Sequence, residues 1–239
     1  IKWATSLVDY NIKVCIVGLS KCTHNIYEKY ENISTYSLGV NTNTIAGDES
    51  SYAKIKYAFL FLKVKQLIRL FSPDIVHAHY ATSYGLLGVL TGFHPLVISV
   101  WGTDIFSFPK KSFLHKNLIQ YLFKRADKIL STSKSMLIET EKYTNKNIEI
   151  TPFGVDITKF FKADVDSLFK KEDIVIGIVK SLEDVYGIEF LISAFSLLKE
   201  RKHNNIKLLI VGGGSQEKKL KKLVQDLKIT NDTVFAGFI

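Results

Sequence analysis

The chain has 239 residues and a formal net charge of +9, with 46% hydrophobic and 23% charged residues. This composition is that of an ordinary soluble globular chain and excludes a low-complexity or fibrous protein, and the length allows one large or two small domains. The positive charge points to acidic partners, namely nucleotide phosphates, anionic lipid or nucleic acid. A bias of the whole chain toward lysine, isoleucine and asparagine explains the charge equally well.

Cysteine usage and hydropathy indicate the compartment. The two cysteines, Cys15 and Cys22, do not show the spacing of a metal site, so we expect free thiols in a reducing environment. No signal peptide is visible. The most apolar window, 84–101, contains Gly92 and Pro95 and therefore predicts a helix, a turn and a strand rather than a membrane span. We expect a cytoplasmic protein and leave peripheral contact with the inner face of the cell membrane open.

The first elements alternate between helix and strand. We expect a helix over residues 1–10, a strand over 13–18 and a short strand over 35–38. Residues 52–71 show a helical pattern with one apolar face and several lysines elsewhere. A solvated basic face is the favoured interpretation of those lysines, with lipid binding as the alternative.

The next predicted strand, 73–79, ends with His77 and His79. The two side chains lie on the same side because alternate residues of a strand share a face. A metal site would need further ligands, and no Cys or acidic cluster of zinc spacing supplies them. We expect His77 to be a buried, hydrogen-bonded structural residue.

Residues 96–100 predict another apolar strand, with Trp101, Gly102 and Asp104 at its tip. The following segment, 106–128, interleaves basic and aromatic residues on one predicted amphipathic helix. Such a helix suits a membrane interface, but an ordinary core-facing helix with a solvated basic side is the favoured interpretation. Nucleic-acid binding has little support, because no helix-turn-helix, zinc or RNA-binding signature accompanies the charge.

The middle of the chain predicts a strand and a helix N-cap over 126–133, a strand and turn over 148–156, and a polar connector over 160–173. The apolar run 174–179 is typical of a strand that is buried on both faces of a parallel sheet. The loop that follows, 180–187, then lies at the carboxyl end of that strand, where open α/β sheets bind ligands.

Lys180 stands at the end of this strand, beside the start of an amphipathic helix over 187–200. A lysine at such a place suits a phosphate, and an incidental lysine on a surface loop is the competing interpretation. A strand over 206–211, the glycines 212–214, a helix over 215–228 that Ser215 could cap, and a strand over 233–235 complete the chain.

The segment from Gly177 to Gly187 resembles the opening of the donor-binding domain in family-4 glycosyltransferases, which have the GT-B fold. Val179 and Leu182 also match the family pattern. Ser181 and Tyr186 stand where the family has arginine and lysine, and Lys180 could supply the missing cation. This variant resembles a branch found among bacterial surface-polysaccharide transferases.

Three further phrases resemble the family, in the order that the family has them. The first is the strand that ends at His79, and in the family this strand ends near the interdomain cleft. The second is Trp101 to Asp104. The third is Pro152 to Asp156, and in the family the backbone of this turn lies near the donor sugar. Trp101 takes the place of a histidine that contacts the acceptor or the donor sugar, and it could stack on a sugar face or pack in the core. Gly212 to Gly214 resembles the family's base-and-ribose loop.

The resemblance implies an α/β fold with two Rossmann-like domains, both incomplete: an acceptor-side domain at 1–159, the connector at 160–173 and the start of a nucleotide-sugar domain at 174–239. The family's first glycine-rich loop and its final pair of glutamates are missing. We therefore expect an internal fragment that is inactive by itself.

The implied function is retaining transfer of a sugar from a nucleotide-sugar donor to a saccharide or lipid-linked acceptor in cell-surface polysaccharide synthesis, without a metal or another cofactor. Two alternatives stay open: a catalytically inactive nucleotide-sugar-binding protein and a nucleotide-sugar 2-epimerase. The implied site has Lys180 as the catalytic cation, acceptor or cleft residues His79, Trp101, Gly102 and Asp104, and donor-binding residues Gly154, Asp156, Lys180, Ser181, Tyr186, Gly187, Gly212 and Gly213.

Overall fold

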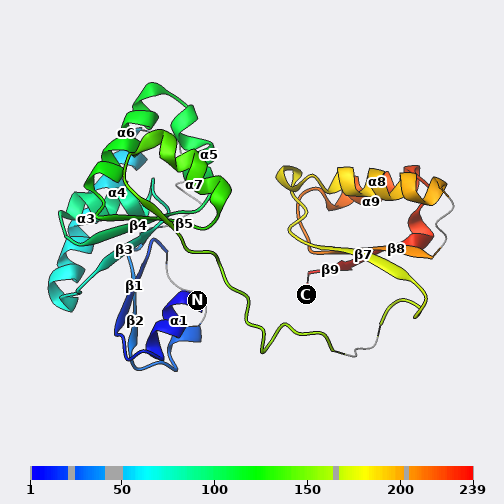
Figure 1. Ribbon diagram of the computed structural model, residues 1–239, viewed down its shortest axis with the longest axis horizontal. Coiled ribbons are helices and arrows are strands. Elements are labelled where there is room, and N and C mark those ends of the chain that lie inside the picture. The colour runs from blue at the N-terminus through cyan, green and yellow to red at the C-terminus, as the bar shows by residue number, and fades with distance from the viewer. Residues whose placement is uncertain (1, 21–24, 41–50, 164–166, 202–204, 239) are drawn as a thin grey trace. The chain divides into compact units, whose positions relative to one another are not determined.

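A computed structural model describes residues 2–20, 25–40, 51–163, 167–201 and 205–238 (Figure 1). The chain divides into two compact units, Ile1–Asp156 and Ile157–Ile239. Each unit is built on parallel strands with helical crossovers, so the prediction of an α/β fold is confirmed.

The first unit contains two parallel sheets. The smaller has two strands, and helix α1 (Lys2–Val8) precedes them. The larger has the order β3-β4-β5-β6. The strands are β1 (Val14–Gly18), β2 (Ile33–Ser37), β3 (Val76–His79), β4 (Leu96–Val100), β5 (Lys128–Ser131) and β6 (Ile148–Ile150).

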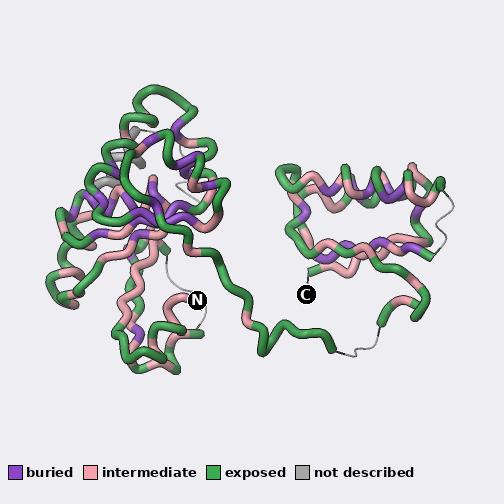
Figure 2. Tube along the Cα trace, in the orientation of Figure 1, coloured by how far each residue is buried: buried purple, intermediate pink, exposed green. Residues whose placement is uncertain are grey.

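Apolar helices and strands form the core of this unit. Ile98 and Ile129 of the sheet and Ile119 and Phe123 of α6 are all fully buried in one cluster. Figure 2 shows the buried positions gathered along the four-stranded sheet. The helices are α3 (Ser51–Phe71), α4 (Tyr84–Thr91), α5 (Thr103–Phe106), α6 (Phe113–Arg125) and α7 (Lys134–Thr140), with short 3-10 turns at Asn25–Tyr27, Phe108–Lys110 and Glu141–Tyr143.

The single amphipathic helix expected over 106–128 is a wrong prediction. The segment forms the end of α5, a 3-10 turn that contains Pro109, and then α6. Ser112 has an extended backbone, and its hydroxyl accepts a hydrogen bond from the His115 N–H, so it caps α6. The pattern is interrupted because a proline and a capping serine both favour helix ends over helix interiors.

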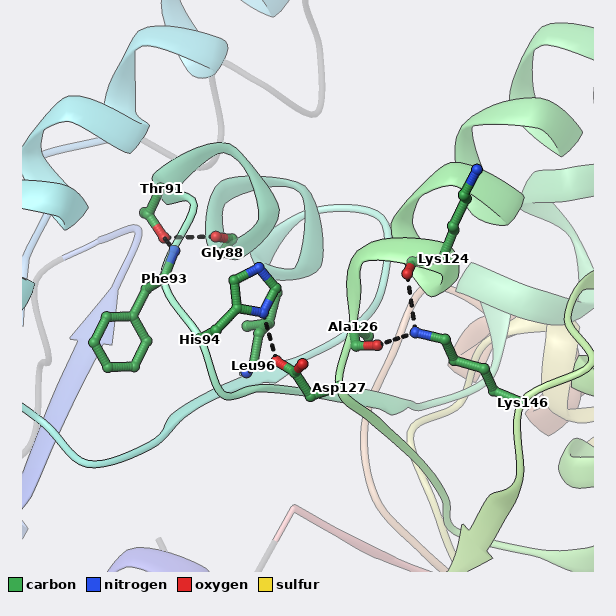
Figure 3. A network of polar contacts seen from close by, with 9 residues as sticks. All are labelled: Gly88, Thr91, Phe93, His94, Leu96, Lys124, Ala126, Asp127 and Lys146. Carbon is green, nitrogen blue, oxygen red and sulfur yellow. Dashed lines mark hydrogen bonds and ion pairs between the residues drawn. The ribbon is translucent and has the colours of Figure 1, made fainter.

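A polar network joins the amino ends of β4 and β5 (Figure 3). Asp127 Oδ2 accepts a 2.6 Å hydrogen bond from the Leu96 N–H and lies 2.7 Å from His94 Nδ1. These two contacts lower the pKa of Asp127. Lys146 Nζ donates to the carbonyl oxygens of Lys124 and Ala126. The network ties loops together at the edge of the sheet opposite the carboxyl ends of its strands.

The second unit has one parallel sheet of order β7-β8-β9, and helices α8 and α9 lie on the same face of it (Figure 1). Leu208 and Ile210 of the central strand are fully buried against Ile192 and Phe195 of α8 and Leu220 of α9. The elements are β7 (Ile174–Val179), α8 (Ile188–Glu200), β8 (Ile206–Val211), α9 (Glu217–Asp226) and β9 (Thr233–Gly237), with 3-10 turns at Asp184–Tyr186 and Thr230–Asp232.

Strand β7 does not have the two buried faces that its apolar sequence predicts. Val175 is 40% exposed and Val179 is 78% exposed, whereas Ile176 and Ile178 are partly buried against the helices. Among the described residues β7 pairs with β8 alone, and the helices cover one of its faces. Within the described part of the chain, β7 is therefore an edge strand with alternating burial.

Three charged residues form an ion triad at the amino ends of β8 and β9. Asp232 Oδ2 lies 3.0 Å from Lys199 Nζ, and Asp232 Oδ1 lies 2.7 Å from Lys207 Nζ. Burial alone would raise the pKa of Asp232, but the hydrogen bonds from Lys207 and Lys199 lower it overall. The triad connects α8, β8 and the turn before β9.

Candidate functional site

Five aromatic side chains of the first unit pack against one another near the carboxyl ends of β3, β4 and β6. Trp3 of α1 contacts His77 and His79 of β3, with ring centroids 5.7 and 5.5 Å apart. The two histidine rings lie 4.1 Å apart. Trp101, directly after β4, lies 5.5 Å from His79 and 5.1 Å from Phe153, which follows β6. We call these residues the ring cluster.

Three members of the ring cluster, Trp3, His77 and His79, are partly buried, and the other two are exposed. Trp101 is 46% exposed and Phe153 is 49% exposed, so both offer apolar ring surface to solvent. His77 Nε2 lies 2.7 Å from Ser99 Oγ, as expected for a structural histidine. Burial lowers the pKa of His77 to about 4 and also lowers the pKa of His79, so both rings are neutral at pH 7. The cluster therefore combines apolar faces with neutral imidazoles.

Asp104 holds the backbone of the turn that carries Trp101 and Gly102. It is completely buried, and its carboxylate accepts hydrogen bonds from the N–H groups of Ala81 at 2.8 Å, Gly102 at 2.8 Å and Trp101 at 3.1 Å. Gly102 has φ 143°, a backbone conformation that side chains rarely allow. The carboxylate of Asp104 is occupied by these backbone donors, so its place in the site is that of a positioning residue.

Tyr80 connects the loop after β3 to the same turn. Its backbone has φ 85°, and its hydroxyl lies 2.5 Å from Thr103 Oγ1. The turn after β6 places Gly154 on the surface and leaves Asp156 half-buried at the end of the first unit. His79, Trp101 and Gly102 thus come together at the carboxyl ends of β3 and β4.

In the second unit, two loops lie side by side at the carboxyl ends of β7 and β8. We call 180–187 the lysine loop and 212–214 the glycine loop. The Lys180 N–H donates to Val211 O at 2.9 Å, and the Leu182 N–H donates to Gly213 O at 3.0 Å. The loops form one hydrogen-bonded surface beside the start of α8.

Two glycines permit this close approach. A Cβ atom on Gly212, where φ is 135°, would lie 2.0 Å from Lys180 O, and one on Gly214 would lie 2.5 Å from Leu182 O. Both distances are shorter than the 3.0 Å that a Cβ atom needs, so a side chain at either position would force the backbone to shift. A Cβ on Gly213 would meet nothing within 4 Å, so this glycine faces open space. Gly213 therefore leaves room for a ligand beside the backbone.

Glu183 links the two loops from the side. Its carboxylate accepts hydrogen bonds from Ser215 Oγ at 2.5 Å and from the Ser215 N–H at 3.0 Å, and these bonds lower its pKa. The prediction that Ser215 caps the next helix is wrong. Helix α9 has Gln216 at its N-cap without a side-chain cap bond, because the Ser215 hydroxyl is used by Glu183.

The remaining residues predicted for the donor side surround the lysine loop. Lys180 Nζ lies 4.2 Å from the ring centroid of Tyr186, and Ser181 is exposed. Gly187 has φ 59° and is the N-cap of α8. Helix N-termini carry partial positive charge, so Lys180 and α8 together make this edge attractive to anions.

Sequence reasoning missed several members of these arrangements. Phe153 sits inside the Pro152 to Asp156 phrase but is not among the predicted site residues, and Trp3 has no sequence signal at all. Glu183 and Ser215 are 32 residues apart, and only the crossing of the two loops brings them together. No group of three or more His, Cys, Asp or Glu side chains that could hold a metal occurs in the part of the chain that the structure describes.

Known families match both units. The family described as "Glycosyl transferase 4-like" matches residues 1–133, and the family "Glycosyl transferases group 1" matches residues 160–239. The chain is 26% identical to N-acetyl-alpha-D-glucosaminyl L-malate synthase of Bacillus anthracis, over 87% of this chain and 56% of that protein. It is also 26% identical to an N-acetylgalactosaminyltransferase of Campylobacter jejuni, named for a diphospho-undecaprenol acceptor, over 77% of this chain and 52% of that protein.

Solved structures agree with this fold. HepE of Anabaena, in complex with UDP, has a TM-score of 0.69 at 17% identity and covers 95% of this chain and 70% of its own. Sucrose-phosphate synthase of Thermosynechococcus elongatus has a TM-score of 0.69 at 16% identity, over 100% of this chain and 63% of its own. The chain spans about half the length of the curated relatives it matches. It therefore belongs to the glycosyl transferase 4-like family, with the GT-B fold.

Proposed function

We propose that this chain is part of a retaining glycosyltransferase that moves a sugar from a nucleotide-sugar donor to a saccharide or lipid-linked acceptor in cell-surface polysaccharide synthesis. The observation that carries the proposal is the joining of the lysine loop and the glycine loop at the carboxyl ends of β7 and β8. They lie in the region that matches the group 1 family. The similar HepE was solved with UDP and with UDP-glucose, and this supports a nucleotide-sugar donor.

The donor side stabilises the leaving group. As the glycosidic bond breaks, the nucleoside diphosphate gains negative charge, and fixed positive groups lower the barrier. Lys180 is the catalytic cation in this proposal, and the first turn of α8 after Gly187 supplies backbone N–H groups. Ser181, Tyr186, Gly212 and Gly213 line the same edge, and residues 174–239 are the donor-side domain.

The acceptor side lies in residues 1–159. An apolar face of a sugar ring can stack on the exposed indole of Trp101, and His79 offers a neutral imidazole at 5.5 Å between ring centroids. Gly102 lets the backbone approach, and Asp104 holds it in place. Gly154 and Asp156, close to the end of this unit, are donor-binding residues in the proposal.

A transfer assay on the full-length protein tests the proposal. UDP-, GDP- and ADP-sugars are offered with saccharide and undecaprenyl-diphosphate acceptors, and the anomeric configuration of the product is measured by NMR. We expect retention, a loss of turnover in Lys180→Ala, and wild-type turnover in Lys222→Ala, an exposed lysine of α9. Nucleotide binding without turnover would favour an inactive binding protein, and a sugar product without acceptor would favour an epimerase.

We also propose that transfer needs no metal or other cofactor. The positive groups of the donor edge are side chains and backbone N–H groups, so the leaving diphosphate has partners from the protein itself. Turnover is expected to be unchanged in excess EDTA. A loss of turnover that Mg²⁺ or Mn²⁺ restores would contradict this part of the proposal.

Helix α6 supports peripheral contact with an anionic membrane at the inner face of the cell membrane. Phe113 is 74% exposed and Leu114 is 77% exposed at its first turn, and Tyr121 is 50% exposed. Lys111, Lys116 and Lys124 are exposed around them. Exposed apolar and basic residues on one helix are typical of an interfacial helix. No helix among the described residues has both the length and the apolar character needed to cross a bilayer.

Vesicle sedimentation tests this contact. Binding to vesicles of phosphatidylglycerol and phosphatidylcholine is expected to exceed binding to phosphatidylcholine alone and to weaken with salt. Replacing Phe113 and Leu114 by serine should weaken it by about tenfold or more. Ile138→Ser, which changes an exposed residue of α7, is the matched control. Equal binding by both variants would exclude α6 as the contact.

A further inference from the structure

We propose that Tyr186 is a positioning residue that holds the Lys180 ammonium beside the start of α8 through a cation–π contact. Lys180 Nζ lies 4.2 Å from the centroid of the tyrosine ring, well within the range of such contacts. Tyr186 directly precedes Gly187, the N-cap of α8, so the ring belongs to the loop that leads into that helix. The inference rests on the proposed function, because it concerns the cation that would meet the donor diphosphate.

Hydrogen bonds hold the backbone that carries the Tyr186 ring. Tyr186 ends a 3-10 turn in which its N–H donates to Glu183 O at 3.0 Å and the Gly187 N–H donates to Asp184 O at 3.2 Å. Glu183 is held in turn by the two hydrogen bonds from Ser215. The backbone of Lys180 is anchored separately on Val211 O at 2.9 Å. Both ends of the contact are therefore positioned by the loops.

The side chain of Lys180 needs such a restraint, because its four-carbon stem is flexible and the residue is exposed. A carboxylate would hold the ammonium too, but it would neutralise the charge and occupy N–H donors. Within the described residues no carboxylate lies at ion-pair distance from Lys180: Glu183 binds Ser215, and Asp184 lies 3.6 Å from Lys219. An aromatic face attracts the cation and leaves its charge and its donors available for phosphate oxygens.

The contact predicts that the aromatic ring matters and the hydroxyl does not. Tyr186→Phe keeps the ring, Tyr186→Leu removes it, and Val185→Ala, at an adjacent residue that is 82% exposed, is the matched control. UDP affinity of the full-length protein is measured by calorimetry. We expect Tyr186→Leu to bind UDP about two- to five-fold more weakly than Tyr186→Phe, the range that a surface cation–π contact allows.

Steady-state kinetics separate positioning from structural damage. If Lys180 acts on charge that develops in the transition state, Tyr186→Leu lowers kcat by a larger factor than it raises KM for the donor. The phenylalanine variant should restore most of the loss. Wild-type UDP affinity and kcat in both the leucine and the phenylalanine variant would overturn the proposal. An equal loss in both variants would overturn it too, because the ring would then not be what matters.

NMR tests the geometry without any reaction. Lysines are reductively methylated with ¹³C-formaldehyde, and the Lys180 signal is assigned by its absence in Lys180→Arg. A ring-current shift in the wild type and in Tyr186→Phe, but not in Tyr186→Leu, is expected. Wild-type UDP affinity in Lys180→Ala would instead refute the donor role of Lys180, which belongs to the proposed function. An effect of Lys180→Ala together with a leucine variant that matches the phenylalanine variant would refute the positioning role alone.

Discussion

Asp104 organises the carboxyl edge of the first unit although it does not face solvent. Its carboxylate receives three backbone N–H groups from two separate turns, and a carboxylate suits this task because it accepts several hydrogen bonds and donates none. Trp101 and Gly102 owe their positions to these bonds. A residue that looks like a ligand contact in the sequence is thus a support for its neighbours.

Asp104→Asn is expected to destabilise the first unit by about 2–4 kcal/mol, because the amide nitrogen replaces an acceptor with a donor that faces other donors. Urea unfolding followed by tryptophan fluorescence measures the loss. Asp74→Asn, at an exposed carboxylate before β3, should change stability by less than about 0.5 kcal/mol. Equal effects of the two variants would show that the Asp104 hydrogen bonds contribute little.

His77 links stability to pH. Burial lowers its pKa from 6.5 to about 4, so the unfolded chain takes up the proton first as the pH falls. Its contribution is complete above pH 6.5 and is lost as the pH drops toward 4.

We expect the first unit to lose about 1–3 kcal/mol of unfolding free energy between pH 7 and pH 4.5 through His77, a range set below the full shift because the ring is only partly buried. His77→Gln removes the titration and should flatten the dependence, with a residual slope from His79, whose pKa is lowered in the same direction. Urea unfolding at several pH values tests this. The same slope in wild type and variant would contradict it.

At the scale of the elements, the arrangement of the donor side depends on how the lysine loop and the glycine loop pass each other. Strand β8 is the central strand, and the loops that leave β7 and β8 touch through backbone atoms because Gly212 and Gly214 have no side chains. The sequence predicted the strands, the glycines and the amphipathic stripes of α8 and α9. It could not predict the Glu183–Ser215 link, because that contact depends on how two loops pass each other.

Gly212→Ala and Gly213→Ala form a matched pair. The first would place Cβ 2.0 Å from Lys180 O at φ 135°, and it is expected to destabilise the second unit by about 2–4 kcal/mol. The second meets nothing within 4 Å and should change stability by about 0.5 kcal/mol or less. Circular dichroism during urea unfolding measures both. An unchanged free energy of unfolding in Gly212→Ala would contradict this, because the two loops could then move apart without loss of stability.

At the scale of the whole molecule, the two units have separate cores. The clusters around Ile98 and around Leu208 share no residue, and both of these side chains are fully buried. The boundary after Asp156 lies close to the polar connector that the sequence indicates. Cores that do not share residues are expected to unfold separately.

Tryptophan fluorescence makes this testable, since both tryptophans of the chain, Trp3 and Trp101, lie in the first unit. Ile98→Ala and Leu208→Ala should each cost about 2–5 kcal/mol in their own unit. Only the first should shift the fluorescence transition, whereas the second should appear in circular dichroism alone. A fluorescence shift in Leu208→Ala would mean that the units unfold cooperatively.

The sequence by itself determined the α/β alternation, most strand positions and the family, because strand runs, helical stripes and short glycine phrases are local patterns in the chain. It also placed Lys180, His79 and Trp101 at strand ends and Gly187 at the start of a helix. Only the tertiary structure decided that β7 pairs with β8 alone among the described residues, and that Asp104 is buried under the turn that it supports. It also decided that Phe153 packs against Trp101 and that Tyr186 contacts Lys180. These features depend on which segments become neighbours after folding, and burial and side-chain contacts follow from that packing rather than from local sequence.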